Sequence, residues 1–246
     1  MRFWKTRGVD EHTPSGLPGG KGYRAYVGPA ENYDVISAMV FNLLTSAGLR
    51  QHHRLLDIGC GSLRSGRLFI PYLNPGNYIG VEPERRMVRE GISHELGKDL
   101  IRLKRPVFSF KASLEEFDEP LGIDYAVAQS IFSHTSKAML EEWLAGVAMH
   151  MKDSGALFAT FIHGDTDYSG DEWVYPGCVK FRIDTMQTLA QKYGYSFQIL
   201  NWYHPLQTWA AFFRRRYPKF QIEGGDVFWN RQKQHRRNHR PGMKKA

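Results

Sequence analysis

The chain has 246 residues, of which 42% are hydrophobic and 24% are charged, and this fits one globular domain with some additional segments. No apolar run is as long as a membrane-spanning helix, and the first residues lack the apolar core of a signal peptide. The two cysteines, Cys60 and Cys178, form neither a metal-binding pattern nor a disulfide framework. These features argue against a membrane-spanning or disulfide-dense secreted protein and predict a reduced, cytoplasmic one.

The net charge of +8 is concentrated at the C-terminus. Residues 231–246 hold seven basic side chains and no acid, so that 8 − 7 leaves +1 for the rest of the chain. We expect this tail to be disordered and solvated, although its cations could also bind the phosphates of RNA. The predicted organisation is an irregular arm at 1–30, a folded domain at 31–230 and the basic tail at 231–246.

The arm is predicted to be irregular because residues 1–30 are rich in glycine and proline. Tyr23 and Tyr26 interrupt this composition. One interpretation is a lid that lays these aromatic rings over a ligand and excludes water. The other is a leader with no role at the site.

Beyond the arm, helix-like and strand-like segments alternate. Helices are predicted at 33–49, 63–73, 84–96, 136–151 and 183–193, and strands at 54–59, 78–82, 107–110, 123–129, 156–162, 196–202 and 208–214. A turn is predicted at 152–155, and the long segment 163–178 is expected to be a functional loop. The alternation predicts an α/β fold, a mostly parallel sheet with helices on both faces.

The chain is organised around segment 55–66, an apolar strand that breaks into a glycine turn and then becomes helical. Glycines let a ligand approach the backbone closely, next to the free N–H groups of a helix start. Asp57 precedes the glycines, and Glu82 ends the next strand, where a carboxylate can accept from both ribose hydroxyls. Arg64 occupies the third position of a dinucleotide fingerprint and argues against NAD. These residues predict a pocket for a positively charged nucleoside without phosphates.

The motif Asp57-x-Gly59-x-Gly61, followed by Glu82 and by the strand at 126–130, resembles the class I S-adenosylmethionine (SAM)-dependent methyltransferases. The resemblance extends from about residue 33 to about residue 214. It implies a Rossmann-like sheet of seven mostly parallel strands that ends in an antiparallel hairpin. It also implies SAM as the cofactor and S-adenosylhomocysteine (SAH) as the product.

The same resemblance implies which residues contact the cofactor. They come from the helix before the first strand, the glycine turn, the end of the second strand, the loop after the third and the end of the fourth: Tyr33, Asp57, Gly59, Cys60, Gly61, Arg64, Glu82, Pro83, Ser113, Leu114, Gln129 and Ser130. Many relatives have an Asp in the loop after the third strand, where this chain has Ser113. This departure leaves the backbone of Leu114 as the alternative contact.

Methyl transfer to an oxygen needs a base that removes the acceptor's proton, and histidine, with an ordinary pKa near 6.5, suits this role. His134 follows the fourth predicted strand and His163 the fifth, so both are candidate bases at the rim of the sheet. The alternative for His134 is a residue that packs or caps at a helix start. His204, between the last two strands, is the weaker candidate.

The loop at 163–178 contains candidate substrate contacts. Its aromatic side chains could form a wall for the substrate or could pack on a neighbouring helix: Tyr168, Trp173 and Tyr175. Its acids supply oxygen ligands of the kind that magnesium or calcium prefers: Asp165, Asp167, Asp171 and Glu172. Since the loop after the fourth strand lacks an Asp that would complete such a site, no metal is expected.

We therefore expect an enzyme that moves a methyl group from SAM to a small-molecule acceptor, most simply at an oxygen. The nearly neutral body and the aromatic loop favour a small molecule. Three alternatives stay open: an RNA methyltransferase that uses the basic tail, a SAM-binding protein without turnover, and an NAD-dependent oxidoreductase. No membrane partner is expected, and the protein is expected to be a monomer or a homodimer.

Overall fold

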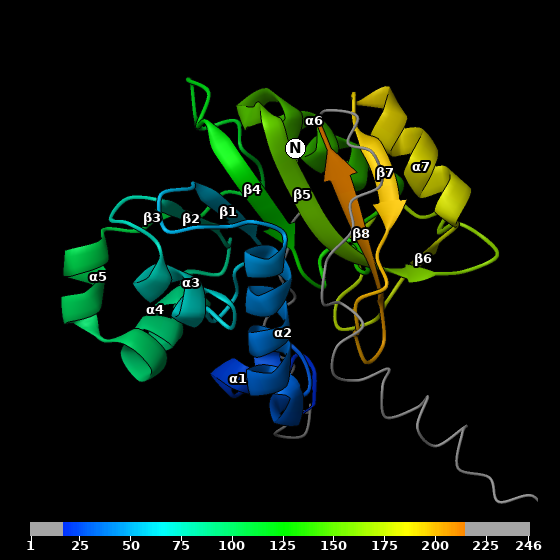
Figure 1. Cartoon of the computed structure of the whole chain (residues 1–246). Coiled ribbons are helices and arrows are strands. Elements are labelled where there is room, and N and C mark those ends of the chain that lie inside the picture. The colour runs from blue at the N-terminus through cyan, green and yellow to red at the C-terminus, as the bar shows by residue number, and fades with distance from the viewer. Residues whose placement is uncertain (1–16, 215–246) are drawn as a thin grey trace, which may run out of the picture.

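The computed structural model describes residues 17–214, which form an eight-stranded sheet flanked by helices (Figure 1). The first 16 residues of the predicted arm and the predicted basic tail lie outside the described residues. Between residues 17 and 214 no helix is long and apolar enough to cross a membrane.

The described elements follow the predicted order closely. The helices are α1 (Tyr23–Tyr26), α2 (Tyr33–Ser46), α3 (Gly66–Tyr72), α4 (Arg85–Gly91), α5 (Lys98–Lys104), α6 (Lys137–His150) and α7 (Ile183–Lys192), with a 3₁₀ turn at Ala30–Asn32 and a π-helical turn at Ile92–Leu96. The strands are β1 (Leu55–Ile58), β2 (Tyr78–Val81), β3 (Val107–Ser109), β4 (Ile123–Ala128), β5 (Met151–His163), β6 (Lys180–Phe181), β7 (Ser196–Ile199) and β8 (Thr208–Phe213).

The sheet has the order β3-β2-β1-β4-β5-β8-β7, and β6 pairs with β5 beside this path. The first five strands of the path run parallel, whereas β8 is antiparallel to both β5 and β7. The predicted Rossmann-like sheet of seven mostly parallel strands with a terminal antiparallel hairpin is confirmed. The added strand, β6, is too short to have a period-2 pattern of its own.

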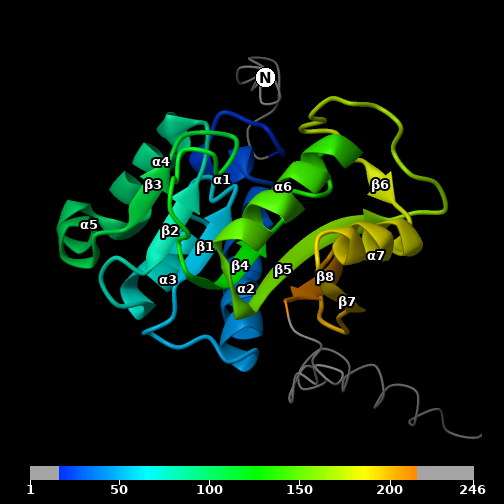
Figure 2. The ribbon, with the colours of Figure 1, turned by 90° about the horizontal axis from the view of Figure 1, so that it is seen from above.

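Side chains of the sheet alternate between two apolar layers. Along β5, Leu157 and Phe161 pack in the layer under α6 and α7, and Phe158, which faces the other way, packs with α2 and α3. Figures 1 and 2 show α2 and α6 on opposite faces of the sheet. Central strands covered on both faces bury every position. This is why β2 and most of β5 appear in the sequence as apolar runs, and why β1 is apolar except for the buried Asp57.

Helices α1 and α5 were not predicted, and several predicted boundaries differ from the structure, two of them for a clear physical reason. The predicted helix at 84–96 changes from α4 to a π-helical turn and stops at Gly97, whose φ of +82° a side chain would rarely adopt. The predicted turn at 152–155 lies inside β5 instead. Met151 pairs with Ile123, but the next pair joins Ala156 to Tyr125, so the polar residues between them form a bulge.

The order in which strands are added to the sheet reverses at β1. The strands β2 and β3 follow on one side of β1, whereas β4 and β5 follow on its other side. In open α/β sheets, ligands bind beyond the carboxyl ends of the strands at such a switch point. The residues that follow β1, β2 and β4 are therefore the ones that position a site.

Candidate functional site

The turn after β1 brings backbone, and not side chains, to the sheet's edge. Gly59 and Gly61 have φ values of +66° and +54°, a region that glycine adopts without strain. The Gly59 N–H donates to Val81 O at 2.8 Å, which ties the turn to β2. From behind, the Tyr33 hydroxyl of α2 donates to Ser62 O at 3.0 Å. The turn is thereby held in one conformation from both sides.

Glu82 stands beside this turn, directly after β2, and is 6% exposed. Its Oε2 accepts from the Gly61 N–H at 3.0 Å, and its Oε1 accepts from the Glu84 N–H at 2.8 Å. Burial raises the pKa of Glu82 to about 7 in spite of these two bonds. Because a carboxylate offers about four lone-pair positions, the two oxygens retain capacity for further donors.

Asp57 lies within β1 and points into the layer under α2 and α3. Its Oδ2 accepts from the Tyr78 hydroxyl at 2.7 Å, and burial raises its pKa to about 7. Asp57 does not line the cavity described below. In this structure, therefore, it supports the strand from below the glycine turn.

Arg64 is a buried cation, 6% exposed. Its Nη1 donates to Val27 O at 2.8 Å, and its Nη2 donates to Gln129 Oε1. Loss of hydration lowers the pKa of Arg64 to about 10, which still leaves it charged at neutral pH. Arg64 thereby connects the glycine turn to the end of β4 and to residues 17–32, here called the N-terminal segment.

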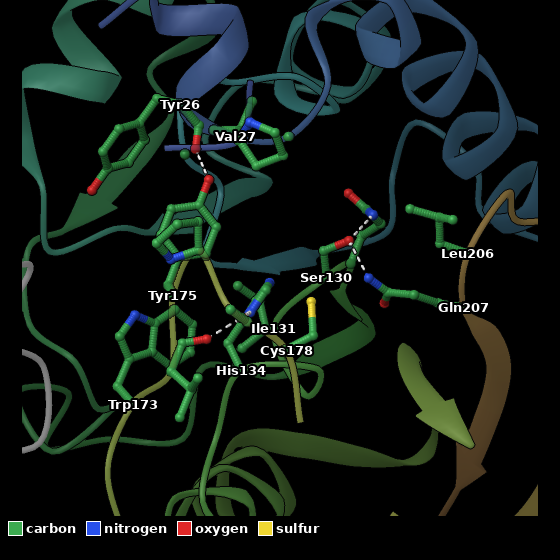
Figure 3. A pocket seen from close by; sticks show the side chains of 18 of the residues that line it. Tyr26, Val27, Ser130, Ile131, His134, Trp173, Tyr175, Cys178, Leu206 and Gln207 are labelled. Carbon is green, nitrogen blue, oxygen red and sulfur yellow. Dashed lines mark hydrogen bonds between the residues drawn. The ribbon is translucent and has the colours of Figure 1, made fainter. Parts of the chain in front are cut away.

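A cavity of about 780 Å³ opens over these residues. The glycine turn and Glu82 form one part of its wall, and α2 and α6 contribute one residue each, Ile36 and Met139. The rest comes from the N-terminal segment, the end of β4, the loop at 171–178 and the loop between β7 and β8 (Figure 3). The volume is in the range of roughly 300–1,000 Å³ that is typical of small-molecule sites.

His134 lies in the cavity wall and is held by the loop at 171–178. Its Nδ1 donates to Gly177 O at 2.6 Å and lies 3.0 Å from Val174 O. Carbonyl oxygens can only accept, so Nδ1 carries the ring proton and Nε2 keeps its lone pair. Burial lowers the pKa of His134 below its ordinary 6.5, so the ring is neutral near pH 7. Its ring meets Tyr175 edge-on, with centroids 4.9 Å apart.

The N-terminal segment covers the cavity, and its two tyrosines act differently. Tyr26 lines the cavity, and its carbonyl accepts from the Tyr175 hydroxyl (Figure 3). Tyr23 points away from the cavity, because its hydroxyl donates to Glu95 Oε1 at 2.8 Å and its ring stacks on His94. The segment is thus joined to α4 and its continuation at one end and to the aromatic loop at the other.

The structure brings nine of the predicted site residues together in the cavity wall: Gly59, Gly61, Arg64, Glu82, Gln129, Ser130, His134, Trp173 and Tyr175. The others lie outside this wall: Tyr33, Asp57, Cys60, Pro83, Ser113, Leu114, His163 and Tyr168. His163 is exposed at the end of β5, Leu114 is a core residue, and Tyr168 packs against the core. Their roles as direct contacts stay predictions that the geometry does not favour.

The sequence did not single out several residues of the wall. Gln207 and Leu206 belong to the loop between β7 and β8, and Val27 belongs to the N-terminal segment. The one available signal was His204-Pro205 between the last two strands. These residues lie in loops, which have no sequence periodicity, and they reach the cavity only because distant segments of the chain meet there.

The acids of the 163–178 loop do not converge. Asp167 accepts from the Arg182 N–H and the Thr185 hydroxyl and so attaches the loop to the start of α7. Asp171 and Glu172 line the cavity mouth. Within residues 17–214, no group of three or more His, Cys, Asp or Glu side chains is arranged to hold a metal ion.

Comparisons with known proteins agree with this geometry. Residues 56–157 match a family described as a methyltransferase domain, whereas no curated protein sequence matches the chain. The solved structures to which the fold is similar include protein PH0226 of Pyrococcus horikoshii, at 14% identity and a TM-score of 0.58, over 75% of this chain and 92% of that one. They also include a SAM-dependent methyltransferase of Leishmania major, at 17% identity and a TM-score of 0.58, over 78% and 76% of the two chains.

A third similar structure is the magnesium protoporphyrin IX methyltransferase of Synechocystis with bound SAH, at 12% identity and a TM-score of 0.51, over 74% and 82% of the two chains. The family match runs from β1 into β5 and therefore includes β1, β2 and β4, whose carboxyl ends lead into the cavity wall. The methyltransferase-domain match supports SAM as the cofactor, as expected from the glycine turn and its acids, and the Synechocystis enzyme of similar fold has been crystallised with SAM and with SAH. The domain match and the fold together support a class I SAM-dependent methyltransferase.

Proposed function

We propose that the protein transfers the methyl group of SAM to an oxygen of a small molecule, with His134 as the base. The observation that carries this proposal is the continuity of one cavity from Glu82 to His134. A cofactor held at Glu82 and an acceptor held at His134 would share a single cavity. A site that merely bound SAM would have no use for the remaining aromatic wall.

The residues near the glycine turn fit the parts of SAM. Glu82 has lone pairs left for the two ribose hydroxyls. The missing Cβ atoms at Gly59 and Gly61 leave room for the side chains of Ile131 and Val27, which pack on the turn and line the cavity beside it. Arg64, a buried cation in the cavity wall, supplies a positive charge for the carboxylate of the methionyl group. These two contacts match two polar parts of the cofactor, the ribose and the methionyl carboxylate.

The chain's own part in the reaction is alignment and proton removal. The cofactor supplies an electrophilic methyl group, so the protein has to place the acceptor in line and accept a proton. His134 offers a neutral Nε2 lone pair at neutral pH, because carbonyl oxygens fix the proton on Nδ1. Trp173 and Tyr175, next to His134, supply flat apolar faces for the acceptor.

The cavity also favours a small acceptor over a nucleic acid. The N-terminal segment joins the loop at 171–178 above it, through the contact of Tyr175 with the Tyr26 carbonyl. An RNA strand would need this cover to open, whereas a metabolite would not. The alternative that uses the basic tail depends on residues outside the described range.

The proposed function is tested by incubating the full-length protein with SAM labelled on its methyl group and a panel of hydroxyl-bearing metabolites. We expect label in at least one small molecule, with release of an equal amount of SAH. Total cellular RNA serves as the competing substrate. Label in RNA and in none of the metabolites would show that the small-molecule assignment is wrong.

Replacing Glu82 with glutamine is expected to weaken SAH binding by about 10- to 100-fold, in line with about 1.5–3 kcal/mol for hydrogen bonds to a charged group. The amide keeps the shape but loses the charge, and one of its two ends can no longer accept. Isothermal titration calorimetry measures the change. Glu84→Gln is the matched control, because Glu84 accepts from the Arg86 N–H at the start of α4 and does not line the cavity. Equal affinities for wild type and Glu82→Gln would remove Glu82 from the cofactor site.

A further inference from the structure

The loop between β7 and β8 brings His204 and Gln207 to the edge of the cavity, next to Gln129 and Ser130 at the end of β4. Gln207 points at Ser130, on the far side of the cavity from Trp173 and Tyr175 (Figure 3). None of these four polar residues is needed to explain the structure of the glycine turn.

The position of the proton on His204 is fixed by the backbone. Nδ1 lies 3.2 Å from the Leu206 N–H and 3.0 Å from the Gln207 N–H, and both of these groups donate to it. A ring nitrogen that accepts carries no hydrogen, so the neutral ring carries its proton on Nε2. Burial and the nearby charge of Arg64 lower the pKa of His204 to about 4, so the neutral form prevails at physiological pH.

The orientation of the Gln129 amide is fixed by Arg64. A guanidinium group can only donate, and Arg64 Nη2 bonds to Gln129 Oε1. The amide nitrogen of Gln129 consequently faces the other way, 2.5 Å from Ser130 Oγ and 3.2 Å from His204 Nε2. Gln129 and His204 thus present N–H donors to each other, and two donors cannot form a hydrogen bond.

The Ser130 hydroxyl has no lone pair left for the N–H of His204. Its Oγ already accepts from Gln129 Nε2 and from Gln207 Nε2, the latter at 3.0 Å, and a hydroxyl oxygen has two lone pairs. Among residues 17–214, no hydrogen-bond acceptor for the His204 Nε2–H is found. The same cluster holds a buried acceptor without a partner in this part of the chain, Gln207 Oε1. One donor and one acceptor are thus left over at the cavity edge.

We propose that Gln129, Ser130, His204 and Gln207 bind a hydroxyl group of the methyl acceptor, to which His204 donates through Nε2. A hydroxyl both accepts and donates, so it suits a cluster with one spare donor and one spare acceptor better than a carboxylate does. Since His134 lies at another part of the wall, this hydroxyl differs from the one that is methylated. The inference rests on the proposed function and narrows the acceptor to a molecule with at least two hydroxyl groups.

The first test reads the histidine tautomers in the free protein and needs no acceptor. In the full-length chain with ¹⁵N-labelled histidine, NMR is expected to show His204 protonated at Nε2 and His134 protonated at Nδ1 at pH 7. The variants His204→Asn and His134→Asn assign the signals, because each removes one of them. A proton on Nδ1 of His204, or a charged ring at pH 7, would overturn the proposal.

The second test identifies the ligand group that accepts a hydrogen bond from the His204 Nε2–H. Methylthioadenosine lacks the methionyl carboxylate that SAH carries, and ethylene glycol supplies hydroxyls alone. We expect the His204 Nε2 signal to be the same with methylthioadenosine and with SAH, and to shift saturably when ethylene glycol is added to the SAH complex. A shift caused by SAH and not by methylthioadenosine would assign the donor to the cofactor's carboxylate, and no response to ethylene glycol would also overturn the proposal.

A matched pair of variants in one loop separates this subsite from general effects. Gln207→Leu keeps the side chain's approximate volume but removes the spare acceptor Gln207 Oε1 and frees a lone pair on Ser130 for the His204 N–H. The response of His204 to ethylene glycol is therefore expected to be lost. Tyr203→Phe, at an exposed residue of the same loop that does not line the cavity, is expected to keep it. The same response in both variants would contradict the subsite. If the labelled-SAM assay methylates no metabolite, the proposed function is refuted. The NMR signals of His204 can be measured whether or not that assay succeeds, so the two failures are distinguishable.

Discussion

Replacement of His134 by asparagine is expected to lower kcat by about 10²- to 10⁴-fold, the usual contribution of a general base. Asparagine still carries an N–H donor for the carbonyl oxygens of Val174 and Gly177, so the loop at 171–178 keeps its anchor. What is lost is the basic lone pair of Nε2. The affinity for SAH is expected to stay within about twofold of wild type, since effects of less than 0.5 kcal/mol are typical of uninvolved sites.

The pH profile of wild-type kcat provides an independent readout of the same role. The pKa of His134 is lowered below 6.5, so its base form persists as the pH falls to that value and is lost at more acid pH. Activity is therefore expected to be flat near neutrality and to decline on the acid side, and His134→Asn should lack this decline. A variant that binds SAH normally and retains full kcat would exclude His134 as the base.

His163→Ala is the comparison for this experiment, because the same sequence argument selected both histidines. His163 is exposed and lies outside the cavity wall. Its replacement is expected to leave kcat unchanged. If His163→Ala lowers kcat and His134→Asn does not, the roles assigned to the two strand ends are reversed.

The second large effect concerns stability and its dependence on pH. The pKa of Asp57 is raised by burial from 3.8 to about 7 in the folded protein. Between these two values the folded state holds a proton that the unfolded state has lost, so the free energy of unfolding falls as the pH rises. At 1.36 kcal/mol for each unit of pKa, the loss is about 4 kcal/mol at most by pH 7. The ligand-free protein is therefore expected to be more stable at pH 5.5 than at pH 7.5.

Asp57→Asn is expected to make the free energy of unfolding less dependent on pH, because the variant has one fewer group whose proton is held only in the folded state. The amide oxygen can still accept from the Tyr78 hydroxyl, so the packing under the glycine turn is retained. Glu82, whose pKa is also raised to about 7, leaves a residual slope of the same sign. Urea unfolding from pH 4.5 to pH 8 measures the two slopes.

The control for this measurement is Asp99→Asn. The side chain of Asp99 is 96% exposed, so its replacement is expected to keep the wild-type slope. If Asp57→Asn shows the same slope as wild type, the Asp57 carboxyl is not the group that holds the proton.

The sequence alone determined the order of the elements, the glycine turn and the place of Glu82. These are local properties: apolar runs of strand length, glycines where the chain must turn, and an acid directly after a strand. Buried parallel strands are apolar at nearly every position, so they can be recognised without knowledge of their neighbours. The methyltransferase prediction followed from this local pattern, and the family match at residues 56–157 includes it.

The tertiary structure alone decided which of the candidate side chains face the cavity. Asp57 and Glu82 both flank the turn in sequence, but Asp57 lies inside its strand and bonds to Tyr78, whereas Glu82 follows its strand and reaches the cavity. His163 is carried past the cavity because β6 pairs with β5 up to that residue. His134 is held in the wall by carbonyl groups more than 35 residues further along the chain. Contacts of this kind join distant segments and leave no periodic signal in the sequence, which is why the acceptor side of the site became visible only in the folded chain.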